Sequence, residues 1–240
     1  MNAKLMLGLL ALAACGGNDA KTAAKPPPVE STTVAASGAT PNAPAPSTTG
    51  VPRVLFLGTS LTAGFGLDDP ATDAYPSVIQ RIADSAHVKA NVVNAGLSGE
   101  TSAGAERRIE WLLKQKPDVV AIETGANDGL RGLNPDSTAA NLKQIIIKIR
   151  AVNPSAGIVL LQMEAPTNLG PDYTKAFHAI FGRVAAQERV TLAPFFLNRV
   201  AGIPKLNQAD GIHPTPEGAR IAAHNLWPTV EQAIQNQRPK

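Results

Sequence analysis

Apolar positions along the chain alternate between short continuous runs and longer stretches with helical spacing. The short runs predict strands at 53–57, 91–94, 118–123, 157–163 and 190–192. The longer stretches predict helices at 74–86, 105–116, 138–152, 172–188 and 215–235. Strands that are apolar throughout and alternate with helices indicate a parallel sheet covered on both faces. With right-handed crossovers, residues 51–240 are expected to form a three-layer α/β/α sandwich with a five-stranded parallel sheet.

Residues 1–50 lack this alternation. A short head containing Lys4 precedes an apolar run from Leu5 to Ala14, and Cys15 follows, as in a secretory signal. The run is too short to span a bilayer, because a spanning helix needs about 20 apolar residues. Residues 18–50 are rich in Ala, Pro, Thr and Ser and lack large apolar side chains. We therefore expect an extended linker without fixed structure there.

The segment Leu12–Cys15 resembles the lipobox of bacterial lipoproteins. The resemblance implies a signal peptide over residues 1–14, acylation of Cys15, and a linker over 15–50 that tethers the domain to a membrane. The alternative is an ordinary signal peptide that happens to contain a cysteine. Gly16 follows the cysteine, and by resemblance to sorting rules this favours the periplasmic face of the outer membrane in a bacterial envelope.

Composition narrows the classes of function. The net charge is only +3, and no cluster of Lys and Arg lies beside aromatic residues, so the sequence gives little support for nucleic-acid binding. The single cysteine cannot form an internal disulfide, and the 4 histidines lack the spacing of a zinc site. We expect a monomer with no metal and no cofactor.

Polar residues with catalytic potential follow the predicted strands. In an open parallel sheet, ligands bind beyond the carboxyl ends of the strands. The loops expected at that edge are 58–62, 94–101, 123–129 and 210–214. They contain a serine, a glycine-rich turn, an Asn-Asp pair and an Asp-x-x-His sequence. The topology therefore predicts that these groups converge.

These residue types suit acyl transfer. Ser60 needs a base to become nucleophilic, His213 can take and return its proton, and Asp210 can fix the histidine tautomer. A developing oxyanion needs hydrogen-bond donors. The backbone N–H groups of Ser60 and Gly99 and the side-chain amide of Asn127 are candidates for this oxyanion hole.

These blocks, in this order, resemble the SGNH (GDSL-like) hydrolase family, from Arg53 to the last predicted helix. The resemblance implies a flavodoxin-like fold, Ser60 as nucleophile, Asp210 and His213 as its partners, and Gly99 and Asn127 as oxyanion donors. Within the family, the arylesterase, acyl-CoA thioesterase and lysophospholipase branch is the most similar, through the segments Asn127–Gly132 and Pro194–Phe196.

The first block departs from the family pattern. Its usual sequence is Gly-Asp-Ser, whereas this chain has Gly58-Thr59-Ser60. The family aspartate is not a member of the triad, so we expect the chemistry to survive. In the family that aspartate helps to hold the loop that carries the nucleophile. Its replacement can therefore change how rigidly this loop is held and how fast the enzyme reacts.

The main prediction is a serine hydrolase of carboxylic esters or thioesters, acting on a small-molecule ester or lipid through an acyl-enzyme on Ser60. Arg131 could meet an anionic head group, but a solvated side chain is favoured. One alternative is O-deacetylation of a carbohydrate or peptidoglycan. Another is an envelope-tethered binding module without catalysis, which Thr59 motivates. By position, an acyl groove would be lined by Leu130, Leu133, Pro166, Leu169 and Tyr173.

Overall fold

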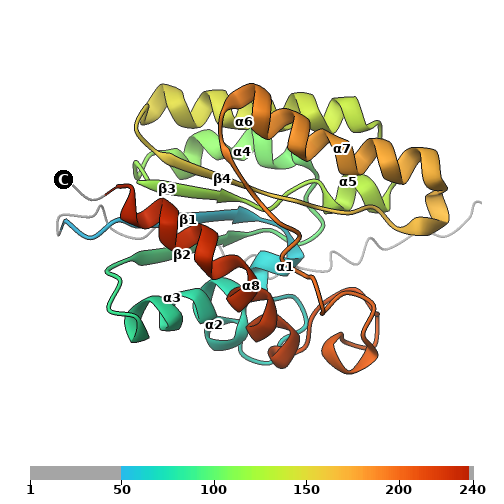
Figure 1. The fold of residues 1–240 in the computed structure, drawn as a ribbon, viewed down its shortest axis with the longest axis horizontal. Coiled ribbons are helices and arrows are strands. Elements are labelled where there is room, and N and C mark those ends of the chain that lie inside the picture. The colour runs from blue at the N-terminus through green and yellow to red at the C-terminus, as the bar shows by residue number, and fades with distance from the viewer. Residues whose placement is uncertain (1–49, 238–240) are drawn as a thin grey trace, which may run out of the picture. The chain divides into compact units, whose positions relative to one another are not determined.

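The computed structural model describes residues 50–237 (Figure 1). The predicted signal peptide, the Cys15 anchor and all but the last residue of the linker lie outside the described residues. Within the described part, no helix has the length and apolar character that crossing a membrane requires.

The centre of the fold is a parallel sheet of five strands in the order β2-β1-β3-β4-β5. The strands are β1 (Arg53–Gly58), β2 (Asn91–Gly96), β3 (Val119–Ile122), β4 (Gly157–Leu161) and β5 (Thr191–Ala193). The central strands β1 and β3 are buried along their whole length, whereas β2 and β5 at the borders are partly exposed. Continuous apolar runs therefore mark the strands that helices cover on both faces.

Helices cover the sheet on both sides (Figure 1). On one side α3 (Tyr75–Ser85) packs against α8 (Pro216–Gln235). On the other side α6 (Pro135–Val152) lies between α4 (Ser102–Leu113) and α7 (Pro171–Glu188). The predicted three-layer α/β/α sandwich is confirmed.

Helix starts are set by caps that apolar spacing does not reveal. We predicted a start at Thr138, but α6 begins at Pro135, because the Asn134 side chain accepts hydrogen bonds from the N–H groups of Asp136 and Ser137. The helix α4 also begins before the predicted Ala105, at Ser102, whose N–H donates to the Asp128 side chain at 2.8 Å. Short elements are not revealed by apolar spacing: α1 (Ser60–Ala63), α2 (Pro70–Asp73), α5 (Ala126–Leu130), and the 3-10 turns Thr167–Leu169 and Pro204–Leu206.

The free border of the sheet at β2 is covered by side chains. Asn91 and Leu97 direct their N–H groups to β1, so the intervening even-numbered residues direct theirs outward. The outward N–H of Val92 donates to Gln80 Oε1 at 2.8 Å, and that of Gly96 donates to Asn94 Oδ1 at 2.9 Å. These donors are therefore satisfied within the chain.

Candidate active site

Ser60 stands at the carboxyl end of the central strand β1. It is the first residue of the short helix α1, so its backbone N–H has no partner within the helix. The helix ends at Gly64, whose left-handed conformation (φ 73°) suits glycine. The strand-to-helix turn thus presents both the hydroxyl and the N–H of Ser60 at the edge of the sheet.

Ser60, His213 and Asp210 form one hydrogen-bonded line. Ser60 Oγ lies 2.8 Å from His213 Nε2, and His213 Nδ1 lies 2.6 Å from Asp210 Oδ2. Hydrogen bonds from the side chain and N–H of His213 and the N–H of Ile212 lower the pKa of Asp210 to about 2. An ionised carboxylate can only accept, so the neutral imidazole carries its proton on Nδ1. Nε2 is then free to accept the proton of Ser60.

The loop that carries His213 is tied to the helix that carries Ser60. Gln208 N–H donates to the carbonyl of His213 at 2.7 Å. The Gln208 side chain also donates to the carbonyls of Phe65 at 2.8 Å and Pro214 at 3.0 Å. The Phe65 ring lies 4.8 Å, centre to centre, from the imidazole. These contacts fix the histidine over the serine, and the sequence did not reveal the role of Gln208.

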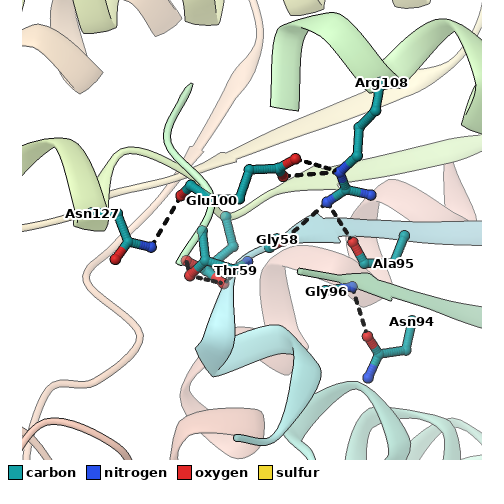
Figure 2. A network of polar contacts seen from close by, with 9 residues as sticks. Gly58, Thr59, Asn94, Ala95, Gly96, Glu100, Arg108 and Asn127 are labelled. Atoms are coloured by element: carbon teal, nitrogen blue, oxygen red, sulfur yellow. Dashed lines mark hydrogen bonds and ion pairs between the residues drawn. The ribbon is translucent and has the colours of Figure 1, made fainter. Parts of the chain in front are cut away.

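Gly99 and Asn127 belong to two loops that meet beside the nucleophile turn. Asn127 Nδ2 donates one hydrogen bond, at 3.0 Å, to the carbonyl of Glu100, next to Gly99 (Figure 2). An amide has a second N–H, which remains available to a ligand. Gly99 has φ +77°, a conformation that L side chains rarely adopt. Each predicted oxyanion donor therefore lies at the same edge of the sheet as Ser60.

Arg131 is exposed, as predicted for a solvated side chain, and it also makes one hydrogen bond to the Gly99 loop. Its Nη2 donates to the carbonyl of Gly99 at 2.9 Å. This contact fixes one side of the glycine peptide, and it places a guanidinium beside the predicted oxyanion hole.

A partly buried ion pair joins the first two loops. Arg108 Nε donates to both carboxylate oxygens of Glu100, at 2.7 and 2.9 Å. Its Nη2 donates to the carbonyls of Gly58 at 3.2 Å and Ala95 at 2.8 Å, the ends of β1 and β2 (Figure 2). The Glu100 side chain is only 6 % exposed, so solvent screens the pair little. Arg108 thus clamps the nucleophile turn to the Gly99 loop.

A further buried carboxylate organises the neighbouring loops. Asp128 accepts hydrogen bonds from the N–H and hydroxyl of Ser102, at 2.8 and 2.5 Å, and from the hydroxyl of Thr138 at 3.2 Å. It therefore links α5 to the first turns of α4 and α6. The sequence placed this residue only in the Asn-Asp pair of the third loop.

A small apolar hollow, with room for about one water molecule, lies beside Ser60 and His213. Its walls include Leu61, Phe65, Leu67, Tyr75 and Phe196. Within residues 50–237, no group of three or more His, Cys, Asp and Glu side chains could hold a metal ion.

The chain is similar to known ester hydrolases. Residues 56–221 match the GDSL-like lipase/acylhydrolase family. The chain belongs to this family. It is 42 % identical over 183 residues to esterase TesA of Pseudomonas aeruginosa, an alignment that covers 75 % of this chain and 89 % of that one. It is 41 % identical over 171 residues to thioesterase 1/protease 1/lysophospholipase L1 of Escherichia coli K12, which covers 71 % of this chain and 79 % of that one.

The fold of this GDSL-like protein also matches solved structures. A crystal structure of TesA superposes with a TM-score of 0.71 at 40 % identity, and covers 75 % of this chain and 99 % of that one. The predictions of an SGNH-type fold and of a serine ester hydrolase are thereby confirmed.

Thr59, which stands where the GDSL motif has an aspartate, is held by a buried carboxylate. Thr59 is fully buried, and it donates from both its N–H and its hydroxyl to the carboxylate of Glu123, at 2.9 and 3.0 Å. The nucleophile turn is therefore held without an aspartate at position 59. Sequence analysis placed Glu123 in the third loop but gave it no role.

Proposed function

We propose that this enzyme hydrolyses carboxylic esters and thioesters through an acyl-enzyme on Ser60. The hydrogen-bonded line from Asp210 through His213 to Ser60 supports this proposal most directly. His213 takes the hydroxyl proton while Ser60 Oγ bonds to the acyl carbon. The same proton then passes to the leaving alcohol or thiol as its bond to the acyl carbon breaks.

The second half of the reaction repeats these steps with water. His213 takes a proton from the water, whose oxygen bonds to the acyl carbon, and returns a proton to Ser60 Oγ as the ester bond breaks. In both halves, negative charge develops on the acyl oxygen. We assign its stabilisation to the N–H groups of Ser60 and Gly99 and to the free N–H of the Asn127 amide.

Exposed apolar side chains around this edge favour substrates with an apolar acyl or aryl part. Large apolar residues that are more than 40 % exposed occur in the loops after β1, β2 and β3 and next to His213: Phe65, Leu97, Leu130, Leu133 and Ile212. Exposed apolar groups gathered at one site are typical of ligand binding. The Tyr173 hydroxyl donates to the carbonyl of Leu133 at 2.7 Å, so two of the five residues assigned to the acyl groove are in contact.

The decisive experiment combines labelling with a series of substrates. The full chain is incubated with a fluorophosphonate, and the modified residue is found by mass spectrometry. We expect modification of Ser60, and loss of both labelling and p-nitrophenyl ester hydrolysis in Ser60→Ala and His213→Ala. The matched control is Ser155→Ala at an exposed turn, which should behave as wild type. A wild-type chain that neither reacts nor hydrolyses would contradict the proposal.

The length of the acyl group separates the two enzymatic candidates. Rates that rise from acetate to butyrate or longer esters support the acyl groove. Activity confined to acetate supports the deacetylase alternative.

The proposed place of action is the bacterial envelope, with Cys15 lipid-anchored and the periplasmic face of the outer membrane favoured. The residues that support this proposal are those of the N-terminal sequence. In cells, Cys15→Ser should release the protein from the membrane fraction and abolish incorporation of labelled palmitate. A variant that remains in the membrane fraction would contradict the anchor.

A further inference from the structure

Glu123 is a fully buried carboxylate directly behind the nucleophile turn. It follows β3, and its relative exposure is 0 %. Burying a carboxylate is unfavourable unless hydrogen bonds compensate. Burial accordingly raises the pKa of Glu123, while hydrogen bonds from Thr59 and Thr62 act in the opposite direction. A buried carboxylate at this position therefore needs a structural or functional reason.

Within residues 50–237, the hydrogen bonds that this carboxylate accepts come from the two threonines that flank Ser60 and Leu61. Thr59 donates its N–H at 2.9 Å and its hydroxyl at 3.0 Å. Thr62 donates its N–H at 3.2 Å and its hydroxyl at 2.7 Å. The Tyr75 hydroxyl lies 2.7 Å from that of Thr62, which it can serve as donor. The carboxylate therefore grips the turn on both sides of the nucleophile.

The space behind the turn is filled. A Cβ at Gly58 would lie 1.8 Å from Thr62 Oγ1 and 2.8 Å from Glu123 Oε2, so only glycine fits there. Arg108 holds the carbonyl of Gly58 from the other side. With its neighbours held in this way, Ser60 has little freedom to move its hydroxyl or its N–H.

We propose that Glu123 is a positioning residue that sets the orientation of Ser60 for attack, in place of the aspartate that usually precedes the nucleophile in this family. The inference rests on the proposed function of Ser60. Glu123 acts through Thr59 and Thr62 and does not touch the substrate. Misplacement of a reacting group by about 1 Å can lower a rate about 100-fold, so a loosened turn should reduce kcat.

The geometry distinguishes two substitutions. Oε2 accepts from the N–H groups of Thr59 and Thr62, which can only donate, so this position requires an oxygen. Oε1 faces the hydroxyl of Thr59, which can also accept. Glu123→Gln can therefore keep these contacts with its amide nitrogen at the Oε1 position. Glu123→Ala removes all of them and leaves the donors buried without partners.

The test compares Glu123→Ala and Glu123→Gln in the full chain. We expect Glu123→Ala to lower kcat and the rate of fluorophosphonate labelling by about 100-fold, with KM changed less than about threefold. Glu123→Gln should stay within about tenfold of wild type. The control is Ile149→Ala in the core of α6, which lowers stability but should leave kcat per labelled serine unchanged.

A second pair of variants covers the case in which Glu123→Ala does not fold. Thr59→Val removes one hydroxyl donor to the carboxylate and should lower kcat several-fold, whereas Thr59→Ser should restore it. Wild-type kcat and labelling rate in Glu123→Ala, or in Thr59→Val, would overturn the inference. If the Glu123 variants are as active as wild type but Ser60→Ala does not hydrolyse esters, the role of Glu123 is wrong and the proposed function of Ser60 stands.

Discussion

His213 Nε2 lies 2.8 Å from Ser60 Oγ, although 153 positions separate the two residues in the chain. The proximity depends on the carboxyl end of β1, where Ser60 lies, and on Gln208. Gln208 donates hydrogen bonds to the carbonyls of both Phe65 and His213. Ser60 and His213 are both only partly buried. The arrangement therefore predicts that changes on either loop affect the reaction more than they affect stability.

Asp210→Asn tests the orientation of the imidazole. An amide can donate to Nδ1, which would favour the tautomer that presents a proton to Ser60. We expect kcat to fall by about 10⁴-fold while the thermal midpoint changes little. Steady-state kinetics and thermal unfolding of the full chain check this. A loss of less than tenfold would show that Asp210 does not set the tautomer.

The pH dependence follows from the same carboxylate. The pKa of Asp210 is about 2, below its usual value of 3.8. Its lowered pKa means that the ionised carboxylate stabilises the fold above about pH 4, and that this contribution is lost as the pH falls through 2. We therefore expect no loss of kcat/KM from titration of Asp210 between pH 4 and pH 9, as measured with a fixed ester. An acid limb that disappears in Asp210→Asn would contradict this assignment.

Asn127→Ala tests the proposed oxyanion hole. The substitution removes the free amide N–H and the bond to the carbonyl of Glu100. We expect kcat to fall by about 10²–10³-fold with a smaller change in KM. Asn153→Ala is the matched control, because its amide also bonds to a carbonyl, that of Pro117, at the opposite edge of the sheet. Equal losses in both variants would argue against a role in the transition state.

Arg108→Lys tests the clamp between the first two loops. A lysine cannot reproduce both the contact with Glu100 and those with the carbonyls of Gly58 and Ala95. We expect a loss of about 1–3 kcal/mol in the free energy of unfolding, together with a lower kcat. Arg220→Lys is the control: its pair with Glu217 is more than half exposed, so solvent screens it and its loss should change stability little. Urea denaturation measures both.

Gly96→Ala and Gly182→Ala form a contrasting pair. A Cβ at Gly96 would lie 2.2 Å from the backbone nitrogen of Ala63, so α1 would have to shift, and with it Ser60. We expect a loss of about 1–3 kcal/mol and a marked fall in kcat. At Gly182, within α7, a Cβ meets nothing within 4 Å. Alanine there should raise stability by about 0.5–1 kcal/mol and leave kcat unchanged.

The sequence predicted the sheet and the loops because both have local signals. Apolar runs marked the strands, and the order of the loops placed Ser60, Gly99, Asn127 and His213 at one edge. It did not predict the roles of Arg108 and Glu123. Their partners lie 50 and 64 positions away, and an isolated charged residue in a sequence is indistinguishable from a solvated one. Such roles emerge only when burial and distance are known.

The role of Thr59 also could not be predicted from the sequence. As a departure from the family motif it suggested a weakened loop or a lost activity. In the structure it is buried, and both of its donors are satisfied by Glu123. One substitution therefore has to be judged together with the residue that faces it.

The amides of Gln80 and Asn94 have an effect beyond the single chain. An open border of a sheet can recruit strands from other molecules and so start aggregation. Here a visiting strand would have to displace two internal hydrogen bonds, those of Val92 and Gly96, to pair along the whole of β2. These two side chains thus disfavour filament growth along this border.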